Sequence, residues 1–213
     1  MPYETARLLN YQSYEQWINS EVFSFGWFFT IGTIAMFYAV WIKLVDRSRM
    51  RDFIVLGSLS AIGFILADMV LQSSLGVAEY KIRPLPWQPA IFIVSVTKAP
   101  ILFMLAQQYS SSWRGYSLWV GIGSGFLAFG LLPIYSLIGI YQLHHWNYFY
   151  QFLLLFTNGV IARGLLLWII SMEKSTSESS RVSSLSLGLQ PVATKPLDNN
   201  NEDKMDNDKL SKE

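Results

Sequence analysis

The 213-residue sequence contains no cysteine, and this absence excludes disulfides, thiolate nucleophiles and thiolate metal sites. It contains only two histidines, the adjacent His144 and His145. Adjacent side chains point in different directions, whereas a zinc site needs at least three protein ligands. Charged residues make up only 15% of the chain, and the net charge of +1 gives no electrostatic footprint for nucleic acid. We therefore predict no metal, no cofactor and no nucleic-acid partner.

The sequence also lacks the common catalytic motifs. It has no P-loop, no G-x-G-x-x-G and no G-x-S-x-G. The stretch "GIGSG" (121–125) lies inside an apolar run, which is the wrong setting for a phosphate loop. We therefore assign no catalytic residue. A hydrolase at the outer face is kept as a third hypothesis, because several suitable side chains fall near the same edge: His144, His145, Ser73, Ser74, Asp68 and Glu79.

Long apolar runs dominate what is present. Hydrophobic residues form 52% of the chain, and several runs approach the roughly 20 residues needed to cross a bilayer core. The pattern predicts an all-α protein, an integral membrane bundle of five transmembrane helices. The predicted regions are an interfacial segment (1–21), a transmembrane domain (22–172) and a disordered tail (173–213). The five predicted spans are 22–44, 53–72, 90–107, 117–140 and 148–171.

The distribution of lysine and arginine predicts the orientation in a cell membrane. Tryptophan and tyrosine crowd the proposed span edges, as interfacial aromatics do. The loop between the first two spans is densely cationic, with Lys43, Arg47, Arg49 and Arg51, whereas the loop after the fourth span has neither lysine nor arginine. The positive-inside rule then places the N-terminus outside and the C-terminus in the cytoplasm.

The two ends of the chain differ in character. Leu8, Tyr11 and Ile18 recur at helical spacing, which favours a short helix on the outer surface, with Ser20 capping the first span. Residues 173–213 are rich in Ser, Asn, Asp and Lys. Such a segment buries too little apolar surface to offset its ordering entropy, so we predict a disordered cytoplasmic tail.

Two opposite charges lie inside predicted spans at comparable depth. At 1.5 Å per residue, Asp68 in the second span and Lys98 in the third differ in depth by about 6 Å. Pairing lowers the cost of a mid-membrane charge, which insertion scales put at about 2.5–3.5 kcal/mol. We therefore predict an Asp68–Lys98 pair. Arg163, in the fifth span, is predicted to extend its guanidinium towards the cytoplasmic side.

The pair has a structural and a functional interpretation. It could fix the packing of spans two and three, or it could line a polar pocket or a proton relay. Pro100 leaves the Val96 carbonyl without its helical partner, so Thr97 or Lys98 is predicted to satisfy that group at a kink. Trp87, in the adjacent loop, is an interfacial anchor or a contact for the same ligand.

Small residues repeat every four positions in the fourth predicted span. Ser117, Gly121 and Gly125 therefore share one helical face and permit close backbone approach. We predict that this face is a helix-packing seam, either within the bundle or between two copies of the chain. The oligomeric state stays open.

Five stretches together carry a family resemblance. In chain order they are "DRSRMRDFIVLGSLSAI", "ILADMVLQSSLGV", "YKIRPLPWQP", "APILFMLAQQYSSSWRGY" and "FGLLPIYSLIGIYQLHHWNYFYQF". Over about residues 38–170 the chain resembles a family of small multi-span membrane proteins of unassigned function from spore-forming Gram-positive bacteria. Members often carry an acid just before the span-three proline, where this chain has Thr97 and Lys98. The resemblance implies a topology and no activity.

A second similarity is to the five-span tryptophan-rich sensory proteins, which bind porphyrin- and sterol-like ligands. It is carried by "PLPWQP" (84–89) and the aromatic load, although here that loop follows the second span instead of the first. From the residues, we expect a non-enzymatic membrane protein that binds a lipid-like or other small apolar ligand, or a membrane partner, near Asp68 and Lys98. The alternative is a transporter or proton-coupled carrier in which Asp68 titrates.

Overall fold

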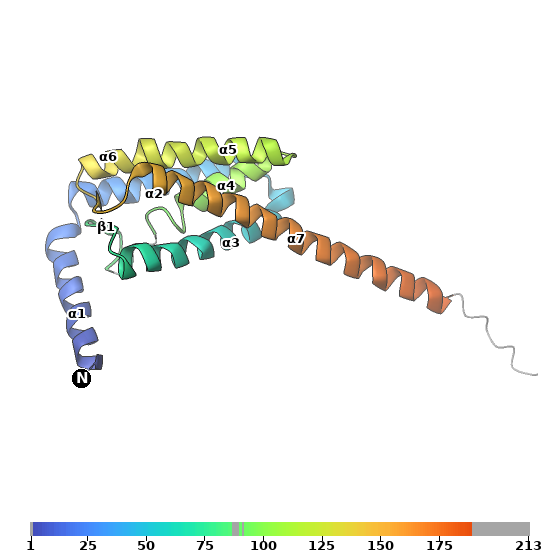
Figure 1. Cartoon of the computed structure of the whole chain (residues 1–213), viewed down its shortest axis with the longest axis horizontal. Helices are drawn as coiled ribbons and strands as arrows, with labels where there is room; N and C mark the ends of the chain where they lie inside the picture. Colours follow the sequence, from blue (N-terminus) through green and yellow to red (C-terminus); the bar gives the residue numbers. More distant parts are fainter. Residues whose placement is uncertain (1, 87–89, 91, 189–213) are drawn as a thin grey trace, which may run out of the picture. The chain divides into compact units, whose positions relative to one another are not determined.

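The chain is mostly helical (Figure 1). The computed structural model describes residues 2–86, 90 and 92–188. The chain divides into two units, 1–170 and 171–213, and the sites below all belong to the first. In chain order the elements are α1 (Pro2–Gln16), η1 (Trp17–Glu21), α2 (Phe25–Leu44), η2 (Arg47–Arg49), α3 (Met50–Asp68), η3 (Met69–Ser74), β1 (Ala78–Tyr80), α4 (Lys98–Gln108), α5 (Trp113–Gly125), η4 (Phe126–Leu131), α6 (Leu132–Leu137), β2 (Tyr141–Leu143) and α7 (Tyr148–Gly188).

Four helical segments are long and apolar enough to cross a membrane. The shortest has 20 residues and is about 30 Å long, which matches the hydrocarbon thickness of a bilayer. Their outer faces expose large apolar side chains, among them Phe28, Ile62, Trp119 and Ile161. Four of the five predicted spans therefore coincide with membrane-length apolar helices: Phe25–Leu44, Arg47–Gln72, Trp113–Leu137 and Tyr148–Ser175.

The third predicted span, 90–107, is not a continuous helix. Residues 92–97 form a turn, called the buried turn below, and α4 begins only at Lys98. With 11 residues, α4 is about 16 Å long. Pro100 is the physical reason, because proline is tolerated in the first turn of a helix but not in its interior. The predicted kink at Pro100 is therefore wrong, since the helix starts there instead of bending.

A small antiparallel sheet, which the sequence analysis does not predict, adds two short strands to the mostly helical fold. Strand β1 pairs with β2 in the register Ala78↔Leu143, Glu79↔Gln142 and Tyr80↔Tyr141. Each strand has only three residues, so no local alternation in the sequence indicates it. The sheet joins the connection after α3 to the connection before α7.

The N-terminal segment is helical, as its spacing predicts. Helix α1 continues into the π-helical turn η1. The cap of α2 is Ser24, whose hydroxyl accepts the Trp27 backbone N–H at 3.2 Å. Ser20, the predicted cap, instead donates to the Gln16 carbonyl at 2.6 Å.

Helix α7 continues past the predicted end of the transmembrane domain. The sequence predicts disorder from residue 173, whereas α7 includes every residue to Gly188. No proline or glycine interrupts the chain between 173 and 187, so nothing in the sequence stops the helix earlier. The rest of the predicted tail, 189–213, lies outside the described residues.

The apolar core surrounds α4. This helix packs against α2, α3 and α5, and Figure 1 shows it among the longer helices. Seven of its residues are buried: Lys98, Ala99, Pro100, Ile101, Phe103, Ala106 and Gln107. Helix α7 joins the core through Leu155, Ala162 and Leu166. Helix α4, which is shorter than the four membrane-length helices, is therefore more completely covered by protein than they are.

Candidate functional site

The buried turn brings non-helical backbone into the interior of the bundle. Ile93, Val94, Ser95 and Thr97 are each at most 5% exposed. Irregular backbone at membrane depth requires such cover, because lipid satisfies no N–H or C=O group. Thr97 Oγ1 donates towards the Phe92 and Ile93 carbonyls at 3.0 and 3.1 Å. The turn is therefore partly stabilised by its own side chains.

Asp68 is bound to this turn. Asp68 is the last residue of α3, and its carboxylate Oδ2 accepts a hydrogen bond from the Ser95 hydroxyl. Asp68 also lines a cavity of about 10 Å³, together with Gln72, Tyr80, Tyr141 and others. That volume holds about one water molecule. Burial raises the pKa of the Tyr80 and Tyr141 hydroxyls, so both stay protonated and available as hydrogen-bond donors.

Lys98 is fully buried and donates to neutral groups. Its Nζ donates to the Ile93 carbonyl at 2.6 Å and to the Tyr135 hydroxyl at 2.7 Å. The Tyr135 hydroxyl lies 2.5 Å from Thr33 Oγ1, which donates to the Thr30 carbonyl at 2.9 Å. Each hydroxyl has one hydrogen, so Tyr135 donates to Thr33 and accepts from Lys98. A directed chain of hydrogen bonds thus connects α4, α6 and α2.

The predicted Asp68–Lys98 ion pair does not form. Asp68 bonds Ser95, and Lys98 bonds the Ile93 carbonyl, so the buried turn supplies a partner to each charge. The depth argument assumed a straight third helix, and the turn replaces the first part of that helix. Both residues are nevertheless buried, and the same six-residue turn connects them.

The remaining predicted members of this site have different outcomes. Thr97 and Lys98 bond carbonyls at 92 and 93, not the Val96 carbonyl that the sequence predicts. Pro100 is buried in the first turn of α4. Trp87 lies outside the described residues.

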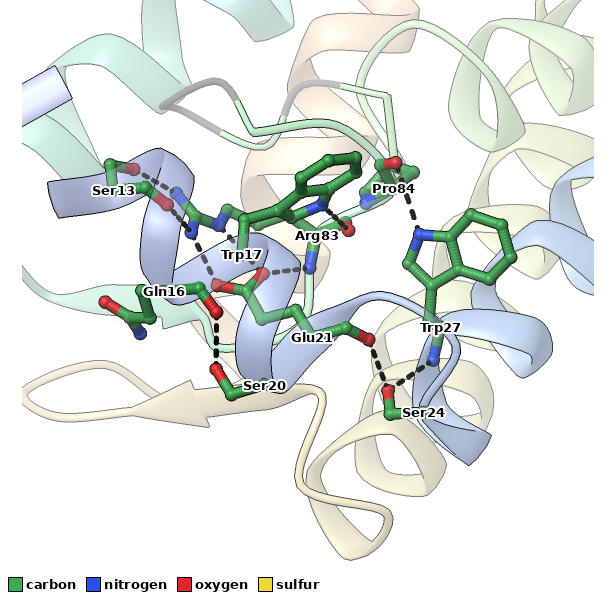
Figure 2. Close-up of polar contacts among 9 residues, drawn as sticks. All are labelled: Ser13, Gln16, Trp17, Ser20, Glu21, Ser24, Trp27, Arg83 and Pro84. Atoms are coloured by element: carbon green, nitrogen blue, oxygen red, sulfur yellow. Dashed lines mark hydrogen bonds and ion pairs between the residues drawn. The ribbon is translucent and has the colours of Figure 1, made fainter. Parts of the chain in front are cut away.

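A buried ion pair that the sequence analysis missed joins the N-terminal segment to the loop after β1 (Figure 2). Arg83 Nη2 lies 2.5 Å from Glu21 Oε1, and Arg83 Nε and backbone N donate to Glu21 Oε2 at 3.0 and 2.8 Å. Both residues are 2% exposed. Arg83 Nη1 also donates to Ser13 Oγ at 2.8 Å. We call this pair and its contacts the N-terminal clasp.

Two tryptophans complete the clasp. Trp17 Nε1 donates to the Arg83 carbonyl at 3.0 Å, and Trp27 Nε1 donates to the Pro84 carbonyl at 3.3 Å (Figure 2). The signal available in the sequence was an acid at the edge of the first apolar run and an arginine in a tryptophan- and proline-rich loop. A separation of 62 residues hides their pairing.

Arg163 lies at the end of the bundle that carries the cationic loop. Its Nη1 donates to the Ser112 carbonyl at 3.2 Å, and its guanidinium packs over the rings of Trp113 and Tyr116 at 5.0 and 4.4 Å. Arg163 is only 3% exposed, so its guanidinium does not reach solvent freely. That this end of the bundle faces the cytoplasm stays a prediction. Among the described residues, no carboxylate pairs with Arg163, and its Nε has no hydrogen-bond partner.

Arg163 borders an open cleft of about 480 Å³. We call it the arginine cleft, and it is lined by Arg49, Gln107, Gln108, Tyr109, Ser110, Ser111, Arg163 and Leu167. Beside it, an apolar groove of about 350 Å³ runs between α4 and α5. We call it the α4–α5 groove, and it is lined by Leu102, Leu105, Ala106, Tyr109, Trp119, Ile122, Gly123 and Phe126. Tyr109 lines both spaces.

The predicted packing seam lies only partly at an interface. A Cβ at Gly121 would meet Phe156 of α7 at 3.7 Å, whereas a Cβ at Gly125 would meet nothing within 4 Å. Ser117 is half-buried. The close approach occurs instead at Gly159 of α7, where a Cβ would lie 2.8 Å from Val120. The small residue that permits tight packing of α5 against α7 is therefore Gly159 on α7, and not a residue of the predicted seam.

The histidines lie at the edge of the small sheet. His144 Nε2 is 3.4 Å from Glu79 Oε1, and both side chains are substantially exposed. Within the described ranges, no group of three or more His, Asp or Glu side chains is arranged to hold a metal ion. Comparison of the chain with protein-family models, with curated proteins and with solved structures gives no match.

Proposed function

We propose that the protein is a non-enzymatic integral membrane protein that crosses the bilayer five times and binds a lipid-like apolar ligand. The fifth crossing is made by the buried turn and α4 together. Gln108, at the end of α4, donates to the Leu44 carbonyl at 2.7 Å and accepts the Asp46 N–H at 2.9 Å. The chain entering the turn comes instead from β1, after the opposite end of α3. These contacts support a traverse between residues 81 and 108.

The charge distribution supports the orientation. Arg47, Arg49 and Arg51 lie in or next to the connection between α2 and α3, and Arg114 follows the connection between α4 and α5. The bonds from Gln108 to Leu44 and Asp46 bring these two connections to one end of the bundle. By the positive-inside rule that end faces the cytoplasm of the cell, and the N-terminal clasp faces outside.

The α4–α5 groove carries the ligand proposal. Its volume of about 350 Å³ falls within the range of small-molecule sites, and its lining is almost wholly apolar. The cavity beside Asp68, at about 10 Å³, leaves room for a water molecule and not for a ligand. The proposed ligand site therefore lies in the groove and not around Asp68 and Lys98, where the sequence predicts it.

Replacing Gly123 with leucine is expected to fill the groove. A Cβ at Gly123 meets the Leu102 side chain at 3.5 Å, in ordinary contact. Because Gly123 lines the groove, we expect the longer side chain to occupy ligand space. Excluding two or three ligand methylene groups, at about 0.8 kcal/mol each, lowers the affinity about tenfold or more. A diazirine-bearing palmitate analogue, crosslinked to purified protein and mapped by mass spectrometry, measures occupancy.

Gly125→Leu is the matched control, because it lies on the same helix, borders open space and does not line the groove. Crosslinks should fall at groove residues such as Leu105 and Trp119 and should be displaced by unlabelled palmitate. Equal labelling of both variants, or labelling spread evenly over the lipid-facing helices, would reject the groove as the binding site.

One observation favours a second function, a proton-coupled carrier. A buried carboxylate bonded to Ser95 beside a water-sized cavity is an arrangement suited to holding a proton. If Asp68 relays protons, Asp68→Asn should lower proton flux into proteoliposomes by about a hundredfold, as read by an entrapped pH dye. Asp52→Asn, the other acid on α3, should leave the flux unchanged. Equal flux through wild type and Asp68→Asn would exclude this carrier.

A further inference from the structure

We propose that the arginine cleft and the α4–α5 groove form one site for an anionic phospholipid, with the phosphate in the cleft and an acyl chain in the groove. This inference rests on the proposed function, since it names the ligand class for the same groove. The two spaces meet at Tyr109, which lines both. One space is polar and cationic, and the other is apolar, so together they match a molecule with a charged head and an apolar tail.

The charges in the cleft favour an anion. Arg49 and Arg163 both line it, and an anion between them would offset the repulsion of these two like charges. Within the described part of the chain, no carboxylate pairs with Arg163. Asp46 attracts Arg49 electrostatically, but its hydrogen bonds go to Ser48, whose N–H and hydroxyl it accepts at 2.9 and 2.7 Å. These bonds hold the pKa of the Asp46 carboxyl below its usual value.

Arg163 is held in place before any ligand arrives. Arg163 is only 3% exposed, and its guanidinium is fixed by the Ser112 carbonyl and by the rings of Trp113 and Tyr116. Its Nε–H nevertheless has no partner. A guanidinium is suited to phosphate because its planar donors match phosphate oxygens. A guanidinium that is already fixed and has no carboxylate partner thus loses little side-chain entropy on binding.

The rest of the cleft supplies neutral hydrogen-bonding groups. Gln107, Gln108, Ser110 and Ser111 line it beside the two arginines. Its volume of about 480 Å³ exceeds that of a bare phosphate ion and leaves room for a headgroup. The cleft also lies at the end of the bundle with the cationic loops, where the anionic lipids of the cytoplasmic leaflet would be.

The test compares two lipids with the same acyl chains and different headgroups. Full-length protein is titrated with phosphatidylglycerol or phosphatidylcholine and analysed by native mass spectrometry. Arg49→Gln should weaken phosphatidylglycerol binding about tenfold or more. It should weaken phosphatidylcholine binding less, because the choline cation already offsets the charge of the same phosphate. Arg49 is exposed, so this variant does not depend on tolerance of a core change. Arg163→Gln should have at least the same effect.

Arg47→Gln is the matched control, an exposed cation of the same loop that does not line the cleft. If it weakens phosphatidylglycerol binding as much as Arg49→Gln does, the effect is general surface charge and the inference is wrong. Equal binding of the two lipids to the wild type would also overturn it. If inorganic phosphate displaces the lipid at a similar concentration, the cleft is a site for a free anion and the proposed lipid site is wrong.

The groove variant separates this inference from the proposed function. Gly123→Leu should weaken the binding of both lipids, because both have the same acyl chains. If it weakens neither, the groove does not bind acyl chains and the proposed function fails. If Gly123→Leu weakens the binding of both lipids, but each arginine variant changes the binding of the two lipids equally, only the preference for an anionic headgroup is rejected.

Discussion

Glu21→Gln is expected to destabilise the protein by about 3–5 kcal/mol, because it leaves Arg83 as a buried charge without its counter-ion. Glu21 accepts three bonds from Arg83, two from the guanidinium and one from the backbone N–H. A neutral amide keeps the size of the carboxylate but accepts at one oxygen only. The free energy of unfolding in detergent, from denaturant or thermal titration, measures the loss.

A double-variant cycle isolates the pair from other effects of the substitution. Glu21→Gln with Arg83→Gln should be more stable than Glu21→Gln alone, because no buried charge is left unpaired. Glu79→Gln is the matched control, since its carboxylate is 52% exposed and its partner His144 is also accessible. A loss below about 1 kcal/mol for Glu21→Gln would place the pair in the range of exposed salt bridges and would contradict its burial.

The clasp also determines which part of the chain should loosen first. Ser13, Trp17 and Glu21 are the N-terminal residues that bond to Arg83, so the segment loses its attachment when the pair is broken. Large apolar side chains of α1, including Leu8 and Tyr11, are otherwise exposed. The same Glu21→Gln variant should therefore show faster proteolysis within α1 than within the loop between α2 and α3.

Apolar runs predicted four of the helices because a run of about 20 such residues has few other stable arrangements. The run at 90–107 is also mostly apolar, but it contains Thr97, Lys98 and Pro100. Its neighbours cover these residues, which allows irregular backbone there. A hydropathy pattern contains no information about such cover. The depth argument for Asp68 and Lys98 therefore identified two buried charges and assigned them the wrong partners.

The other missed features depend on contacts between distant parts of the chain. Glu21 and Arg83 are 62 residues apart, and strands β1 and β2 pair over only three residues each. Arg49 and Arg163 come from opposite halves of the sequence, and only the folded chain brings them to one cleft. The sequence indicated which residue types were unusual for a membrane interior. Which of them meet is decided by how the helices pack.

Helix packing is tested most directly at Gly159, where Gly159→Ala is expected to destabilise the protein by about 1–3 kcal/mol through overpacking. A Cβ there would lie 2.8 Å from Val120 Cγ1 and 3.0 Å from Phe103 Cζ, both in the core. The Gly159 carbonyl also accepts the Tyr116 hydroxyl at 2.8 Å, so α7 cannot shift away without stretching that bond. Unfolding in detergent again provides the measurement.

The control lies one turn further along the same helix. A Cβ at Gly164 would meet nothing within 4 Å, so Gly164→Ala should be neutral or stabilising by up to about 1 kcal/mol from helix propensity. Val120→Ala should partly rescue Gly159→Ala, because it removes the methyl group that the new Cβ meets. If the two glycine variants are equally stable, or if the second substitution adds its full cost to the first, α5 and α7 do not approach each other at Gly159 and Val120.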